Sequence, residues 1–317
     1  MIDVQILSKT NETADICLLE LGRSDKRPLP AFSAGAHIDL HLPGGLVRQY
    51  SLCNHPGESD RYEIAVLRDP ESRGGSMAVH DQLQTGDSIR ISEPRNLFPL
   101  EHETGRHLLI AGGIGITPIL CMAERLAHMD SPFELHYCSR TAEETAFRER
   151  ILQSRFADRV HFHFSREEDG GRLDADTLLS NPDSETHLYV CGPNPFMEHI
   201  LQRARANGWP DARLHREYFA ADPISHEADT AFEIQLASSG KVLTVPADRT
   251  ALQVLLERDI DVPFACEEGV CGSCSTRLLE GEPEHRDLYM TAEEHASNDE
   301  FALCCSRAKS NRLVLDI

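Results

Sequence analysis

Apolar and polar residues alternate over short runs through the first hundred positions of the chain. Strand candidates with this alternation lie near 2–9, 14–21, 36–42, 47–53, 61–68 and 87–92, and Gly, Pro and Asn separate them. A period of two is typical of strands that bury one face, and short strands at regular spacing favour an antiparallel barrel. We therefore predict an antiparallel β-barrel over residues 1–103.

The pattern changes near residue 105, where continuous apolar runs begin to alternate with amphipathic segments. The run 107–111 predicts a buried strand, and a glycine turn leads from it into a helix that reaches Leu126. Further strand candidates lie at 133–138, 160–164, 187–191 and 213–218. Strands that alternate with helices indicate a parallel, doubly wound sheet, so we predict an α/β domain over 104–222.

The last part of the chain has the pattern of a separate α+β domain. Polar residues over 223–231 predict a linker. Beyond it, 232–317 opens with a hairpin pattern around 238–241 and contains a helix candidate near 250–258. The 317 residues are thus expected to form a multidomain protein in which each part holds its own core.

Four cysteines in this last domain have the spacing of a plant-type 2Fe-2S site. Cys266, Cys271 and Cys274 follow a C-x4-C-x2-C pattern, and Cys304 lies further along the chain. Small residues between them let the backbone approach a cluster. A four-cysteine zinc site is the alternative, but such sites usually pair two C-x2-C hooks and this chain has one. Cys305 competes for the fourth position, and the spacing favours Cys304.

The charge balance restricts the class of partner. Lys and Arg number 31 against 52 Asp and Glu, so the net charge is −21. This charge opposes a polyanion, and we expect no nucleic acid binding. The acidic surface could steer a basic partner or merely keep the chain in solution, and the sequence leaves these two possibilities open.

Compartment and assembly are inferred from what the chain lacks. It has no apolar run long enough to cross a membrane and no signal-peptide pattern at its start, so we expect a cytoplasmic protein without a membrane partner. The ten cysteines are then expected to be reduced thiols or cluster ligands. A monomer is the default expectation.

One strand candidate of the predicted barrel carries Arg48, Tyr50 and Ser51. Alternation places Arg48 and Tyr50 on one face, where a cation could hold a phosphate and an aromatic ring could cover a flat ligand. The Ser51 hydroxyl could hydrogen-bond a ring nitrogen. Gly75 and Ser76 stand at the start of a helix candidate whose N–H groups would complete a phosphate site. A strand arginine alone is more often a surface charge.

A glycine-rich turn, 111–118, joins the first parallel strand to the following helix. It differs from the G-x-G-x-x-G fingerprint, but glycines at a helix N-terminus still let a pyrophosphate approach the backbone. A second turn, 191–193, follows another strand at the edge where open α/β sheets bind ligands. Together the two turns predict a dinucleotide crevice, whereas either alone is compatible with an ordinary tight turn.

Taken in order, these motifs resemble the phthalate dioxygenase reductase and vanillate O-demethylase reductase family over essentially the whole chain. The resemblance implies an FMN-binding barrel, an NAD-binding α/β domain and a β-grasp-like ferredoxin domain. It further implies the reductase component of a two-component oxygenase or demethylase. Electrons would pass from NAD(P)H through FMN to the 2Fe-2S cluster and on to a Rieske-type oxygenase, a transient partner.

The resemblance also implies roles for single residues. Arg48 would contact the FMN phosphate, Tyr50 the flavin ring and Ser51 the neighbourhood of flavin N5. Gly75 and Ser76 would help to hold the phosphate. Around the dinucleotide and the flavin, the implied residues are Gly112, Gly113, Gly115 and Thr117 for the nucleotide, Cys191 and Gly192 near the nicotinamide, and Phe219 against the flavin.

Ser139 and Arg140 end the second parallel strand, where the ribose of a dinucleotide is expected. Arg140 could accept a 2′-phosphate or be a surface charge, and the resemblance favours NADH with NADPH still possible. No acid, base or nucleophile is required of the chain, because bound cofactors carry the chemistry. His161 and His163 share one strand face, but without further ligands a surface location is favoured over a metal site.

Other functions remain open from the sequence. A reductase of this build could serve a diiron monooxygenase, free flavin or ferric iron. A non-enzymatic iron-sulfur carrier or sensor would have lost flavin and nucleotide binding, and the intact Arg48, Tyr50, Ser51 and glycine turn speak against it.

Overall fold

The computed structural model describes residues 1–101, 105–167, 171–221 and 228–317. By compactness the chain divides into two units, Met1–Glu217 and Tyr218–Ile317. The predicted domain limits near 103 and 222, and residues 223–227 of the predicted 223–231 linker, lie outside the described residues. In the described part, none of the helices is long and apolar enough to cross a membrane.

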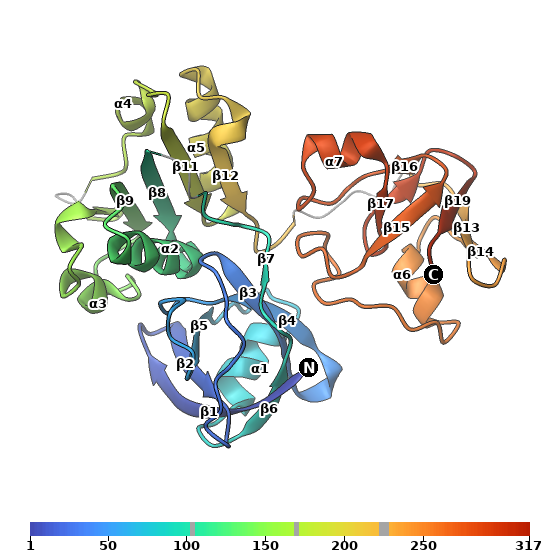
Figure 1. Ribbon diagram of the computed structural model, residues 1–317, viewed down its shortest axis with the longest axis horizontal. Helices are drawn as coiled ribbons and strands as arrows, with labels where there is room; N and C mark the ends of the chain where they lie inside the picture. Colours follow the sequence, from blue (N-terminus) through green and yellow to red (C-terminus); the bar gives the residue numbers. More distant parts are fainter. Residues whose placement is uncertain (102–104, 168–170, 222–227) are drawn as a thin grey trace. The chain divides into compact units, whose positions relative to one another are not determined.

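The first unit begins with an antiparallel barrel. Its elements are β1 (Ile2–Asn11), β2 (Ile16–Gly22), β3 (Ala36–His41), η1 (Pro43–Gly45), β4 (Val47–Ser51), β5 (Tyr62–Leu67), α1 (Gly75–Gln82), β6 (Ser88–Ile91) and β7 (Arg95–Asn96). The strand order is β4-β3-β6-β1-β2-β5, with β7 paired to β3 (Figure 1). An antiparallel bridge between Leu52 and Ile64 joins the two ends of this order, so the sheet closes as predicted. Alternation puts Ile6, Ile38 and Leu40 in the interior, where they are fully buried.

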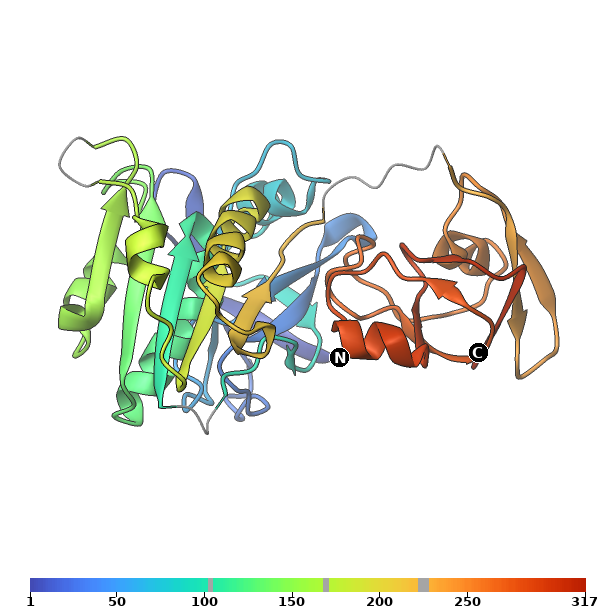
Figure 2. The ribbon, with the colours of Figure 1, turned by 90° about the horizontal axis from the view of Figure 1, so that it is seen from above.

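The same unit continues into a five-stranded parallel sheet. Its elements are β8 (Arg106–Gly112), η2 (Gly113–Gly115), α2 (Ile116–His128), β9 (Phe133–Ser139), α3 (Arg148–Leu152), η3 (Ala157–Arg159), β10 (Val160–Phe164), α4 (Ala175–Leu179), β11 (Thr186–Cys191), α5 (Asn194–Ala206), η4 (Asp211–Arg213) and β12 (Leu214–Glu217). The strand order is β10-β9-β8-β11-β12, which is the predicted doubly wound arrangement. Helix α5 lies along β11 and packs against α4 (Figure 2). The order reverses between β8 and β11, so the turns that follow these two strands flank one crevice.

The barrel and the parallel sheet share one hydrophobic core. Ile16, Cys53 and Phe98 of the barrel belong to the same buried cluster as Ile119 and Met122 of α2. A partly buried ion triad lies beside this core. The guanidinium of Arg150 on α3 contacts the carboxylates of Glu63 in the barrel (2.6 Å) and Glu124 on α2 (2.7 Å). Met1–Glu217 is therefore one body rather than two loosely joined domains.

The second unit forms a mixed sheet with a helix packed on it. Its elements are β13 (Phe232–Leu236), β14 (Val242–Val245), α6 (Ala251–Leu256), β15 (Ser275–Glu280), β16 (Pro283–Glu284), α7 (Ala292–Ser297), β17 (Glu300–Ala302), β18 (Arg307–Ala308) and β19 (Arg312–Leu315). The strand order is β14-β13-β19-β15-β17, and β16 pairs with β18. A capping box at Thr250 starts α6, and Leu252 and Leu255 enter a core that also contains Phe301. This is the predicted β-grasp-like arrangement.

Replacement of Arg150 tests the ion triad between the barrel and the sheet. Arg150→Ala leaves Glu124 without its cation and Glu63 with Arg61 alone, at 3.0 Å, so the folded state carries a poorly compensated buried charge. Because Arg150 keeps 31% of its side-chain exposure, we expect a loss of about 2–3 kcal/mol rather than the full cost of a buried pair. Thermal unfolding of the flavin-loaded protein measures this loss of stability.

The matched control for this experiment is Arg205→Ala, which breaks the exposed pair with Asp211 in the same unit. Its effect should stay below about 1 kcal/mol, as for ordinary surface ion pairs. Equal thermal unfolding midpoints for Arg150→Ala and Arg205→Ala would show that the Arg150 ion triad contributes no more stability than a surface ion pair.

Candidate functional site

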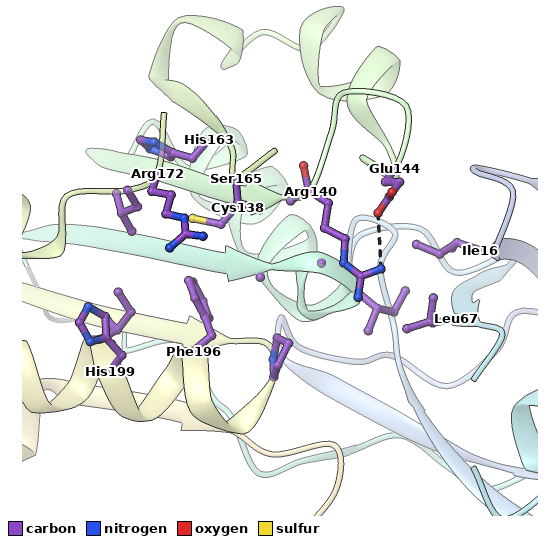
Figure 3. A pocket seen from close by; sticks show the side chains of 17 residues that line it. Ile16, Leu67, Cys138, Arg140, Glu144, His163, Ser165, Arg172, Phe196 and His199 are labelled. Atoms are coloured by element: carbon purple, nitrogen blue, oxygen red, sulfur yellow. Dashed lines mark ion pairs between the residues drawn. The ribbon is translucent and has the colours of Figure 1, made fainter. Parts of the chain in front are cut away.

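A cavity of about 500 Å³ opens beside the carboxyl ends of the parallel strands (Figure 3). The turn after β8 contributes Gly112 and Gly113, and the barrel contributes Ile16 and Leu67. The rest of its wall consists of Ile114, Cys138, Ser139, Arg140, Glu144, His163, Ser165, Arg172, Leu173, Pro193, Phe196, His199 and Ile200. The cavity thus lies in the predicted dinucleotide crevice and contains four of the predicted residues: Gly112, Gly113, Ser139 and Arg140.

The turn after β8 needs glycine at its narrowest point, because a side chain there would collide with the turn after β11. A Cβ on Gly115 would lie 2.3 Å from the carbonyl oxygen of Cys191, so the turns after β8 and β11 can approach each other only with glycine there. Thr117 is buried, and its hydroxyl donates to the carbonyl of Ile114 at 3.1 Å. Gly115 and Thr117 therefore shape the turn, whereas Gly112 and Gly113 face the cavity.

The turn after β11 also packs closely against the turn after β8. A Cβ on Gly192 would lie 3.0 Å from the Cα of Gly112. Cys191 is fully buried. Both residues lie behind the cavity wall, where they fix the spacing of the two turns.

Charged side chains surround the mouth of the cavity beyond β9. The Arg140 guanidinium lies 3.7 Å from the Glu144 carboxylate (Figure 3). The same carboxylate also pairs with Arg166 at 3.5 Å. The Ser139 hydroxyl is engaged locally, 2.6 Å from the hydroxyl of Thr145. A carboxylate therefore lies between two arginines at the position where the ribose of a dinucleotide is expected.

The predicted phosphate-binding residues of the barrel meet at the start of α1. Arg48 donates to the carbonyl of Arg73 at 3.0 Å, and a Cβ on Gly75 would lie 2.4 Å from Arg48 Cγ. The guanidinium is thereby held against the helix N-terminus, where N–H groups favour an anion. The Ser76 hydroxyl instead donates to the carbonyl of Asp69, so it serves the preceding loop. Burial raises the pKa of Tyr50, which keeps its phenol protonated.

A buried carboxyl connects the barrel to the end of the parallel sheet. Ser51 donates from its hydroxyl to Glu217 Oε2 at 3.1 Å, and Cys191 donates from its thiol to the Glu217 carbonyl at 3.5 Å. His37 Nδ1 lies 3.9 Å from Glu217 Oε1. Burial raises the pKa of Glu217 to about 8, while the hydrogen bond from Ser51 opposes this shift. The structure thus brings Ser51 to the Glu217 carboxyl, whose raised pKa favours the protonated form at neutral pH, and Cys191 to the main chain of the same residue.

Glu217 is not among the predicted site residues, whereas Phe219, two positions later, is. Glu217 is the last residue of β12, and the carboxyl end of a parallel strand was the signal that could have identified it. Phe219 falls in the second unit and is 40% exposed. Its role against a flavin stays a prediction.

The four predicted cluster cysteines come together in the second unit. Cys266, Cys271, Cys274 and Cys304 are all buried. The amide of Glu268 donates to Cys266 Sγ at 3.4 Å. Contacts from the sulfurs of Cys271 and Cys304 lower the pKa of Cys266, and the same crowding raises the pKa of Cys304.

Cys305 contacts the side chain of Cys304, but it packs against the loop at Gly269. Gly269 has a φ of 76°, and a Cβ there would lie 2.6 Å from Cys305 Sγ, so Cys305 packs behind the loop. Four converging, solvent-shielded sulfurs with amide donors fit a 2Fe-2S cluster. Those four cysteines would hold it.

Comparison with known proteins decides the family. The chain is 55% identical over 317 residues to vanillate O-demethylase oxidoreductase of Pseudomonas sp. strain HR199, with 100% of both chains covered. It is 40% identical over 315 residues to a phthalate 4,5-dioxygenase oxygenase reductase subunit of Pseudomonas putida, which covers 99% of this chain and 96% of that one. The chain belongs to the vanillate O-demethylase and phthalate dioxygenase reductase family.

Domain models and a solved structure agree with this family. The 2Fe-2S iron-sulfur cluster binding domain matches residues 234–309, and the N-terminal domain of dimethylamine monooxygenase subunit DmmA-like proteins matches 88–214. The crystal structure of phthalate dioxygenase reductase, described as modular for electron transfer from pyridine nucleotides to 2Fe-2S, has a TM-score of 0.75 and 37% identity. It covers 100% of this reductase and 98% of that chain.

Family membership confirms several predictions. The multidomain architecture is confirmed, and this reductase is an NAD(P)H-dependent flavin iron-sulfur oxidoreductase. A flavin, a pyridine nucleotide and a 2Fe-2S cluster are its cofactors, and it is the reductase component of an oxygenase system. The roles of individual flavin and nucleotide residues stay predictions.

The raised pKa of Glu217 predicts a specific dependence of stability on pH. The folded protein keeps a proton that the unfolded chain releases above its ordinary pKa of 4.5, so stability falls as the pH rises from 4.5 through about 8. Glu217→Gln has no proton to lose at this position. We expect the variant and the wild type to be similarly stable near pH 4.5, and the variant to be the more stable of the two above about pH 8.

Thermal midpoints of the flavin-loaded reductase across this pH range measure the effect. Glu198→Gln serves as the control, because Glu198 is exposed on α5 and its replacement should leave the pH profile unchanged. Parallel profiles for Glu217→Gln and the wild type would refute the buried, protonated carboxyl.

Proposed function

We propose that this reductase takes electrons from NADH and delivers them, through FMN and its 2Fe-2S cluster, to a Rieske-type oxygenase that demethylates a methoxybenzoate such as vanillate. The observation that carries the substrate class is the 55% identity, over the full length, to vanillate O-demethylase oxidoreductase. The reductase itself binds no aromatic substrate. Its partner therefore sets the organic chemistry.

FMN is favoured as the flavin by the shape of the anion site. Arg48 and the first N–H groups of α1 form a compact cradle that matches a terminal phosphate. Gly75 and Ser76 begin that helix. Tyr50 lies on the same strand as Arg48, at a position to cover the ring system.

When bound, the flavin supplies the exchange between a nicotinamide hydride and the single electrons that an iron-sulfur cluster carries. Ser51 presents its hydroxyl to the region assigned to flavin N5 and is oriented by Glu217. The Glu217 carboxyl keeps a proton within one hydrogen bond of that hydroxyl. The chain thus holds a proton at the place where hydride transfer alters the charge of the flavin.

The cavity beside the glycine turn is proposed to hold the dinucleotide. Gly112 and Gly113 admit the pyrophosphate to the backbone at the start of α2. Glu144 lines the same cavity, and its carboxylate would accept a hydrogen bond from a ribose 2′-hydroxyl while repelling a 2′-phosphate. NADH is therefore the proposed donor, and Arg140 is engaged by Glu144 instead of awaiting a phosphate.

The cellular setting and the partner contact complete the proposal. We infer that the reductase works as a monomer in the cytoplasm and meets its oxygenase transiently, since a carrier must release each partner after electron transfer. The acidic residues in the cluster loop and in the segment that follows it in the sequence (Glu267, Glu268, Glu280, Glu282 and Glu284) would steer a basic docking surface.

Replacement of one cluster cysteine tests the electron path. Cys274→Ser should abolish NADH-dependent reduction of a one-electron protein acceptor, such as the partner oxygenase or cytochrome c. Bleaching of the flavin by NADH should persist, because Cys274 belongs to the second unit and the flavin and nucleotide sites to the first. Anaerobic absorbance titration and acceptor kinetics measure the two steps separately.

Cys305→Ser is the matched control for the cluster variant. It should retain about two irons per chain and full acceptor reduction, because its sulfur packs behind the loop. Loss of both activities in Cys274→Ser would show that the loop is needed for the whole fold. Loss of iron in Cys305→Ser would reassign the fourth ligand.

A charge change at the cavity mouth tests the nucleotide preference. Glu144→Gln removes the repulsion of a 2′-phosphate, worth about 1 kcal/mol in a solvated site, and the kcat/KM ratio of NADH to NADPH should fall by about fivefold. Glu143→Gln is the control, since the neighbouring carboxylate is exposed and outside the cavity wall. An unchanged ratio in Glu144→Gln would remove Glu144 from nucleotide selection.

A further inference from the structure

Three ionisable side chains from neighbouring strands meet on one face of the parallel sheet. His161 of the edge strand β10 pairs in register with His136 of β9. Glu134 precedes His136 by two residues on β9, so its side chain lies on the same face. In the sequence alone, the histidines of β10 have no apparent further ligands, and a surface location was predicted for them. The sheet supplies two more, from a strand 25 or more positions away.

The donor atoms of this group have the spacing of a metal site. Glu134 Oε1 lies 3.1 Å from His136 Nε2 and 3.0 Å from His161 Nε2. All three atoms lie within 4.8 Å of one another, and the two imidazole rings stack with centroids 4.9 Å apart. A tetrahedral ion with bonds of about 2.1 Å separates its ligands by about 3.4 Å. The observed spacing needs only small side-chain movements to match.

Neighbouring side chains hold these donors in place. Arg106 pairs with the other oxygen of Glu134 at 2.7 Å, which orients Oε1 toward the imidazoles. His163 Nε2 lies 3.0 Å from His136 Nδ1, so a hydrogen bond there fixes the His136 ring and leaves Nε2 for a ligand. Supporting hydrogen bonds of this kind are the usual second layer of a histidine metal site.

The burial of the three ligands suits an ion that remains accessible. His136 is buried, Glu134 keeps 26% of its side-chain exposure and His161 keeps 49%. An ion bound here would have protein on one side and water on the other. The fourth position would belong to solvent, as in zinc sites with three protein ligands.

We propose that Glu134, His136 and His161 form a binding site for a divalent transition metal ion, best represented by Zn²⁺. Two imidazole nitrogens and one carboxylate oxygen favour zinc, copper or nickel over the oxygen-preferring magnesium and calcium. This site lies on the nucleotide-binding part of the first unit and is separate from the four cysteines of the second unit. It does not depend on the proposed function.

A second histidine pair in the same sheet shows what distinguishes this group. His187 of β11 and His215 of β12 also stack, with centroids 5.1 Å apart and a nitrogen contact of 2.8 Å. Among the described residues, that pair has no third ligand within metal-binding distance. His187→Ala therefore removes an imidazole of the same kind without touching the proposed site.

Zinc binding by the complete, cofactor-loaded protein tests the proposal. Equilibrium dialysis against buffered free Zn²⁺, with bound zinc measured by mass spectrometry, would give the affinity of wild type, His161→Ala, Glu134→Gln and His187→Ala. Because a second group (His285, Asp287 and His295) could also bind zinc, the comparison between variants decides the outcome. Iron content and cluster absorbance, followed in parallel, show that zinc has not replaced iron.

We expect His161→Ala and Glu134→Gln each to weaken the site by at least about tenfold, and His187→Ala to leave it unchanged. X-ray absorption at the zinc edge should show nitrogen and oxygen ligands without sulfur. NADH-dependent cluster reduction in His161→Ala verifies the fold, since this residue lies outside the cavity wall. Equal zinc affinity in wild type and both site variants would overturn the proposal and leave a hydrogen-bonded cluster.

Discussion

The shared core between the barrel and the parallel sheet is the constraint on which the flavin and nucleotide sites depend. Ile16 and Phe98 of the barrel pack into the same cluster as α2, and Arg150 fixes two carboxylates beside it. The cavity is lined from both parts, and the hydrogen bond between Ser51 and Glu217 joins them. A change in the packing of the two parts would therefore alter both the cavity and the buried carboxyl.

The same packing explains why a carboxyl can remain protonated at neutral pH. Glu217 ends its strand inside the interface, where burial penalises the charge more than the Ser51 hydroxyl compensates it. In contact with water, the Glu217 carboxyl would ionise at its ordinary pKa of 4.5. The fold thus keeps a carboxyl with a raised pKa beside Ser51.

The cluster loop shows a different use of close packing. Gly269 approaches Cys305 and the Asp287 backbone so closely that any side chain would collide. The loop backbone is held near the sulfurs, and its amides can point at them. Electron carriers benefit from such rigidity, because hydrogen bonds to the sulfurs help to set the reduction potential.

The barrel and α/β patterns, the glycine turns and the four cysteines could be predicted from the sequence, because each depends on local periodicity or on spacing along the chain. Glu217, Glu144 and the Glu134–His136–His161 group were decided only by tertiary structure. The role proposed for each depends on a contact with a residue that is distant in the sequence. Glu217 contacts Ser51, Glu144 contacts Arg166, and His136 pairs with His161 on the adjacent strand. Strand order and burial in the interface determine these contacts, and neither can be read from the local pattern of apolar and polar residues.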